Sequence, residues 1–120
     1  MRVVVPSETD EGFGSLRSGH FGHTPWFTIV TIQDGKCTQV EVAQNVDHDL
    51  VGCGGVIDYV VSLDVDAIIA MGMGVPPFTR FTQAAITVYI DGTQPYVGGA
   101  ITLLLQDRLP QMQLDQACRH

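Results

Sequence analysis

The sequence predicts one α/β domain in which a mixed five-stranded sheet carries helices on both faces. Two β-rich runs, 26–32 and 36–43, are joined by Asp34-Gly35, which is a strong hairpin signal. After this hairpin, helical and strand patterns alternate along the chain. The length of 120 residues is that of a single domain with enough residues for a hydrophobic core.

The other strands are read from short apolar runs. They are residues 2–6, 65–71 and 86–90. The second of these is apolar apart from Asp66 near its start, as expected for a strand that is covered on both faces. Because an antiparallel pair is followed by alternating strands and helices, a three-layer α/β/α arrangement is expected.

Three helices complete the pattern. Helical spacing of apolar residues begins at Gly54, and Pro76-Pro77 opens a second helix, because proline is tolerated in the first turn. A third helix starts near Val97 and ends near Pro110. We expect residues 1–110 to form one domain and residues 111–120 to be a loosely attached, mobile tail.

Composition excludes several classes of protein. The formal net charge is −7 and no cluster of Lys or Arg exists, so nucleic acid is not expected as a ligand. No apolar run approaches the roughly 18 residues that span a bilayer. The N-terminal apolar segment is too short for a signal peptide, so we expect a cytoplasmic protein. The 3 cysteines make a disulfide framework improbable in that compartment.

Three glycine-rich loops carry the residues of a candidate ligand site. They are residues 20–23 (His-Phe-Gly-His), 52–55 (Gly-Cys-Gly-Gly) and 71–74 (Met-Gly-Met-Gly). His, Cys and Met are donors that transition metals and metal–sulfur clusters prefer, and glycine lets the backbone approach a ligand closely. We therefore predict one ligand site built from three loops.

Each candidate also has a plain structural interpretation. A histidine can sit in a surface loop, and a free cysteine is commonly a small buried hydrophobe. Cys53 is favoured as functional because it begins a helix, where the dipole stabilises a thiolate. Cys37 is expected to be non-functional, because strand alternation places it on the face of Gln39 and Glu41. Met71 and Met73 are more consistent with core packing than with thioether ligation.

The expected place of the site is the edge where parallel strands end. Residues 7–24 and 71–77 fall on that edge if the strands before them are parallel. The loop that carries Cys53 feeds a helix N-terminus, so we expect it at the opposite edge or curled over to join the others.

Enzyme signatures are weak. Pro77 stands where a dinucleotide fingerprint needs its third glycine, and no Lys-Ser/Thr pair follows a glycine loop. No serine lies in a nucleophile elbow, and a Cys53–His20 dyad lacks a third, orienting group. We expect a binding protein rather than an enzyme.

Four segments combine into a specific pattern: Ser18-Gly19-His20-Phe21-Gly22, Pro25-Trp26-Phe27, Cys53-Gly54-Gly55 and residues 65–74. In these segments the chain resembles the dinitrogenase iron–molybdenum cofactor biosynthesis family of small cofactor carriers. The resemblance implies a ribonuclease-H-like α/β/α fold without nuclease chemistry, and binding of an anionic metal–sulfur cluster. Gly19, where relatives often carry an acidic residue, and Pro76-Pro77 are departures from the family pattern.

The resemblance also implies a set of site residues, with His20 as the leading ligand. The cluster contacts would be His20, Phe21, Gly22, Gly54, Gly55, Gly72, Met73 and Gly74. The candidate metal ligands are His20, His23, Cys53, Cys118 and His120, the last two on the tail, where such residues also occur by chance. Arg17 and Arg80 flank the loops and are candidate counter-charges for an anion.

The resemblance leaves the metal open: an iron–molybdenum, iron–sulfur or molybdenum–copper sulfide cluster. The expected partners are proteins of cofactor assembly or acceptors, with a cell-division-type ATPase as a candidate, and the protein is expected to be a monomer or weak dimer. Two alternatives stay open. One is a mononuclear zinc or transition-metal protein that uses His20, His23, His48 and Cys53. The other is a metal-free regulatory interaction module.

Overall fold

The predicted five strands and three helices are confirmed. The computed structural model describes residues 1–113, without the side chains of His48, Asp49, Val51 and Cys53. The strands, in the spatial order β3-β2-β1-β4-β5, form one sheet. Their bounds are β1 Arg2–Ser7, β2 Trp26–Gln33, β3 Lys36–Gln44, β4 Ala67–Ala70 and β5 Thr87–Ile90. The ribonuclease-H-like label for this fold stays a prediction.

The sheet is mixed, as the element order predicts. β1 pairs antiparallel with β2 and parallel with β4, and β4 pairs parallel with β5. Asp34 and Gly35 join β2 and β3 with φ values of 53° and 75°. Positive φ at both central residues is what a two-residue hairpin turn of type I′ requires, so this turn chemistry fixes the hairpin.

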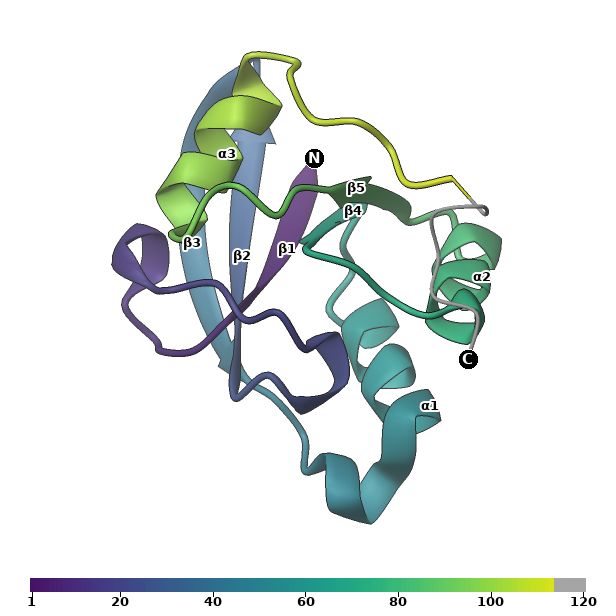
Figure 1. Ribbon diagram of the computed structural model, residues 1–120. Coiled ribbons are helices and arrows are strands. Elements are labelled where there is room, and N and C mark those ends of the chain that lie inside the picture. The colour runs from purple at the N-terminus through teal and green to yellow at the C-terminus, as the bar shows by residue number, and fades with distance from the viewer. Residues whose placement is uncertain (114–120) are drawn as a thin grey trace.

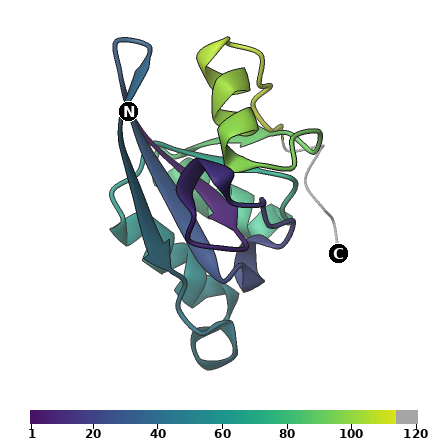
Figure 2. The ribbon, with the colours of Figure 1, turned by 90° about the vertical axis from the view of Figure 1, so that its left-hand side faces the viewer.

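Three helices, α1 His48–Ser62, α2 Val75–Gln83 and α3 Val97–Leu105, cover the sheet in three layers. α1 and α2 pack with Val4 and Ile29 on one face, in a cluster that includes Phe81. α3 packs with Val3 and Val30 on the other face. Figures 1 and 2 show α3 alone on its side of the sheet, with α1 and α2 on the other side.

Helix α1 is kinked at Gly52, whose φ of 71° and ψ of 179° are not helical. That region of backbone space is essentially reserved for glycine. The helix begins at His48, before the predicted start at Gly54, and its second part follows the kink. Cys53 is thus the first residue beyond the kink.

All the candidate loops meet at one edge of the sheet. β3 pairs antiparallel with β2, and β2 pairs antiparallel with β1, so β3 runs in the same direction as β1. Both strands therefore end at the edge where β4 and β5 also end. Of the two expected arrangements, the Cys53 loop therefore has the one in which it joins the others. A place at the opposite edge was wrong, because α1 starts soon after the end of β3.

The face assigned to Cys37 was also wrong. An irregularity between Thr31 and Ile32 shifts the register, so that Cys37 pairs with Ile32 whereas Gln39 pairs with Thr31. Ile32 packs against the α3-side cluster, which places Cys37 on that same face of the sheet rather than on the face of Gln39. Cys37 is exposed.

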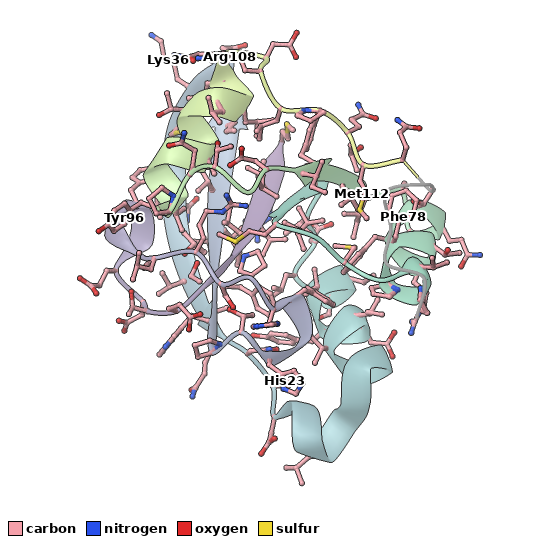
Figure 3. The ribbon with its side chains drawn as sticks, viewed as in Figure 1. His23, Lys36, Phe78, Tyr96, Arg108 and Met112 are labelled. Atoms are coloured by element: carbon pink, nitrogen blue, oxygen red, sulfur yellow. The ribbon has the colours of Figure 1, made fainter. Side chains whose placement is uncertain are left out.

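The segment after α3 returns to the edge strand β5. Gln111 forms a bridge with Tyr89, and the Met112 N–H donates to the Val88 carbonyl at 2.7 Å. Met112 is buried and lies beside Phe78, where both line a groove of about 450 Å³ between α2 and β5 (Figure 3). The predicted tail thus begins with attached residues, and residues 114–120 lie outside the described part of the chain.

No helix among the described residues is long and apolar enough to cross a membrane.

Candidate functional site

Two of the three predicted loops form a pocket of about 450 Å³ at the carboxyl edge of the sheet. One wall is residues 19–23, and the other is residues 71–74 with Pro77. Of the predicted contacts, the pocket brings together His20, Phe21, Gly22, His23, Gly72, Met73 and Gly74. Residues that are far apart in the sequence therefore converge because their strands end side by side.

The His-Phe-Gly turn is anchored to the core by its aromatic ring. Residues Phe21–His23 form a single 3-10 turn, η2, closed by the His23 N–H, which donates to the His20 carbonyl at 3.2 Å. Phe21 is 6% exposed, and its ring packs edge-on against Phe81 of α2 at a centroid distance of 5.3 Å. The phenylalanine is therefore chiefly an anchor, and it leaves the flanking residues at the surface.

Hydrogen bonds fix the two ends of this turn. The Ser18 N–H donates to the Pro6 carbonyl at 3.0 Å, and the Thr24 hydroxyl donates to the Ser7 carbonyl at 2.8 Å. Asn45 follows β3, and its side-chain amide donates to the Thr24 carbonyl at 2.8 Å. Residues 19–23 are consequently held between Ser18 and Thr24, each of which is hydrogen-bonded to the end of β1.

Both imidazoles of the turn are exposed at the pocket. His20 and His23 are surface residues that line it. Figure 3 shows His23 beside the first turns of α1. His23 also lines a second, more polar pocket of about 350 Å³ together with Asn45 and Asp47. An imidazole in this position can reach a ligand in either pocket.

The opposite wall of the pocket contributes two thioethers. Met73 is 6% exposed and belongs to the core cluster of α1 and α2, so it packs the core and lines the pocket at once. Met71 is half-buried, and its sulfur lies 3.6 Å from the position that a Cβ atom on Gly19 would take. None of the lining residues is a carboxylate, although the chain carries 13 acidic residues.

The third predicted loop does not line this pocket. Gly54 and Gly55 lie in α1, which contacts both η2 and α2. A Cβ atom on Gly54 would lie 3.5 Å from Nη1 of Arg80, and Arg80 forms an exposed ion pair with Asp58. The side chain of Cys53, and both Cys118 and His120, lie outside what the structure describes. Within the described residues, no group of three or more His, Cys, Asp or Glu side chains is placed to hold a metal ion.

A buried ion pair supports the loop that leads into the pocket. Nη1 of Arg17 donates to Asp91 Oδ2 at 3.0 Å and to the Gln94 carbonyl at 3.1 Å. The two side chains are 1% and 8% exposed. Burial lowers the pKa of Arg17, an effect that the charge and hydrogen bond of Asp91 oppose.

The carboxyl group of this pair remains ionised. Burial acts to raise the pKa of Asp91, whereas hydrogen bonds from the Thr93 hydroxyl and from the backbone N–H groups of Gln94 and Thr93 lower it. The charge of Arg17 adds to these, and the pKa of Asp91 lies below its ordinary value.

Sequence reasoning named Arg17 as a candidate counter-charge but did not identify its partner. Asp91 directly follows β5. The available signal was its place directly after the last strand, because all the strands that run parallel to β1 end at this edge. The pocket is also lined by Gly19, Met71 and Pro77, which the sequence did not predict as cluster contacts.

Comparisons with known proteins agree with this architecture. A family model described as dinitrogenase iron-molybdenum cofactor matches residues 1–107. An uncharacterised protein of Methanocaldococcus jannaschii, MJ0580, is 26% identical over 117 residues, which covers 94% of this chain and 92% of the relative. The crystal structure of PH0822 matches with a TM-score of 0.79 at 25% identity, over 93% of this chain and 96% of the other. The apo orange protein from Desulfovibrio gigas shares the fold, with a TM-score of 0.77 at 20% identity over 92% of each chain.

Proposed function

Because the chain belongs to the dinitrogenase iron-molybdenum cofactor family, we propose that it binds an anionic metal–sulfur cluster as cargo for cofactor assembly or delivery. The observation that carries this proposal is the pocket between η2 and the β4–α2 loop. There two imidazoles and two thioethers converge, and the lining includes no carboxylate. Such donors suit soft and borderline metals, and the absence of acids from the lining favours an anion.

The donor set fits a preassembled cluster better than a single ion. A structural zinc ion needs four protein ligands in a tetrahedron, whereas the pocket wall supplies two imidazoles and two thioethers. A cluster brings its own sulfide ligands, so one or two imidazoles and apolar contacts are enough to hold it. The volume of about 450 Å³ lies within the range of small-molecule sites.

Each pocket residue has a role in this proposal. His20 ligates or contacts the cluster at the rim, and His23 acts as a second donor beside it. Gly22, Gly72 and Gly74 permit close approach of the backbone, while Phe21 and Met73 form the apolar wall. Cys53, Gly54, Gly55, Cys118 and His120 stay proposed as further contacts. The cargo would be an iron–molybdenum, iron–sulfur or molybdenum–copper sulfide cluster.

The proposed role is that of a carrier rather than an enzyme. A carrier must release its cargo, and an open, shallow set of ligands suits release better than a closed cage. The proposed partners are assembly or acceptor proteins in the cytoplasm, with a cell-division-type ATPase as a candidate. No nucleic-acid or membrane partner is proposed.

Anaerobic purification, followed by an absorption spectrum and by metal and sulfide analysis, tests this function. The proposal predicts broad visible charge-transfer bands together with sulfide and with iron, molybdenum or copper. Stoichiometric colourless zinc would instead support the mononuclear alternative. A third outcome is that metal and sulfide are absent from the purified protein and also after reconstitution with iron and sulfide or with thiomolybdate. That result would contradict the cluster proposal and the mononuclear alternative alike.

A further inference from the structure

One edge of the buried Arg17 guanidinium has no partner. Nη1 serves Asp91 and Gln94, but Nε and Nη2 are buried and lack a hydrogen-bond partner among the described residues. The side chain is 1% exposed. An unsatisfied buried donor costs about 1–3 kcal/mol, and more when it is charged, so such an arrangement calls for an explanation.

The unpartnered atoms form a recognition element. Nε and Nη2 present two parallel N–H donors on one side of the planar group, the fork that pairs with two oxygen or sulfur atoms of an anion. Asp91 lies on the Nη1 atom, so its carboxylate does not occupy this edge. The fork is rigid, because Nη1 is held at two points.

The fork belongs to the same chain segments as the pocket. Arg17 does not line the pocket itself, but it precedes the wall residue Gly19 by two positions. The sulfur of Met71 lies 3.6 Å from the position that a Cβ atom on Gly19 would take. The Asp91 N–H donates to the Ala70 carbonyl at 3.0 Å, so the partner of Arg17 is bonded to the residue before Met71. Arg17 and the Gly19–Met71 wall therefore adjoin each other at the ends of β4 and β5.

We infer that the Nε–Nη2 edge of Arg17 is an anion-recognition group of the pocket. In this proposal the edge takes a tetrahedral dianion by two of its sulfur or oxygen atoms, after a movement of the Met71 side chain opens a route to it from the pocket. This inference rests on the proposed function. It specifies which atoms of the cargo Arg17 would bind, namely two neighbouring anionic atoms of a thiometallate or an oxometallate. The imidazoles of His20 and His23 would then contact the metal-bound sulfur atoms from the rim of the pocket.

Titration of the full-length apo protein with tetrathiomolybdate, molybdate and sulfate tests the inference and separates the possible sources of the anion. Arg17→Lys keeps the charge but removes the fork, and should weaken binding of the preferred anion about 10- to 100-fold, as expected for the loss of a hydrogen bond to a charged group. Arg108→Lys is the matched control, because Arg108 lies at the end of the molecule opposite to His23 (Figure 3). Its affinity should equal that of the wild type.

Two further measurements keep the test decisive if Arg17→Lys folds poorly. In the wild-type protein, the Arg17 Nε–H signal in proton–nitrogen spectra should shift on saturation with the bound anion. Met71→Ala should raise the association rate, and an unchanged rate would contradict the route past Met71. If the wild type binds the anion while Arg17→Lys binds equally well or the Nε–H signal does not move, this inference fails alone. If the wild type binds none of the three anions, this inference fails, whereas the proposed function is decided separately by reconstitution with iron and sulfide.

Discussion

The ring of Phe21 meets the ring of Phe81 at an interplanar angle of 81° with centroids 5.3 Å apart. Phe81 is completely buried in α2, the helix that follows the β4–α2 loop. The contact thus joins the two chain segments that form the pocket. The distance between the pocket walls is set by core packing rather than by the exposed residues at the rim.

Replacement of Phe21 should therefore act on stability as well as on binding. Phe21→Ala should cost about 3–5 kcal/mol of unfolding free energy, measured by urea denaturation, because it leaves a cavity beside Phe81. Phe13 is 40% exposed and provides the control. Phe13→Ala should cost clearly less, and equal costs would show that Phe21 is not a core anchor.

Replacement of His20 should act on binding alone. The imidazole is exposed, so His20→Ala should change the unfolding free energy by no more than about 0.5 kcal/mol. Cluster retention after reconstitution should fall about tenfold or more, which corresponds to a loss of about 1.4 kcal/mol or more in binding free energy. Lys36→Ala, at the far end of the molecule (Figure 3), should retain the cluster fully.

A clear loss of stability in His20→Ala would instead identify a structural histidine. Unchanged metal content in this variant would remove His20 from the set of ligands.

The thioether of Met73 can be tested against a methionine of similar burial. Met73 and Met112 are 6% and 4% exposed, but only Met73 lines the pocket. Substitution by leucine conserves volume and should cost less than about 1.5 kcal/mol at either site. Met73→Leu should shorten cluster retention under chelator challenge, whereas Met112→Leu should not. Equal retention in the two variants would mean that Met73 contributes packing only.

The buried Arg17–Asp91 pair should make stability depend on pH. The pKa of Asp91 is lowered in the folded protein, so the stability from its ionised form is present above the unfolded-state pKa of about 3.9. This stability is lost as the pH falls through the lower, folded-state pKa. Asp91→Asn should destabilise the protein by about 3–5 kcal/mol at pH 7, because it leaves Arg17 without its counter-charge.

The same pair of proteins, unfolded in urea at a series of pH values, completes this test. The difference in unfolding free energy between the wild type and Asp91→Asn should narrow as the pH drops below about 4. A constant difference down to pH 2 would show that the charge of Asp91 is not what the wild type loses.

Local signals in the sequence were enough to predict the order of elements. These signals are the Asp34-Gly35 turn, the apolar runs and the Pro76-Pro77 helix start. Each depends only on residues close together in the sequence, so contacts between distant segments do not alter it. The meeting of residues 20–23 with residues 71–74 also followed, because parallel strands end at a common edge.

The features that sequence reasoning missed depend on contacts between distant segments. The irregularity at Thr31 and Ile32 reverses the face of Cys37, and alternation alone cannot reveal such a shift. The pairing of Arg17 with Asp91 joins residues 74 positions apart. The apolar spacing indicated a helix only from Gly54, so the turn of α1 that precedes the kink at Gly52 was missed.

Amide chemical shifts during titration of isotope-labelled apo protein with tetrathiomolybdate test the central claim most directly, because they locate the bound ligand. The account predicts that the largest changes fall on residues 19–23 and 71–74, with Lys36 and Arg108 unaffected. Changes centred on the groove between α2 and β5, at residues 85–88 and 111–113, would place the ligand elsewhere and contradict the account.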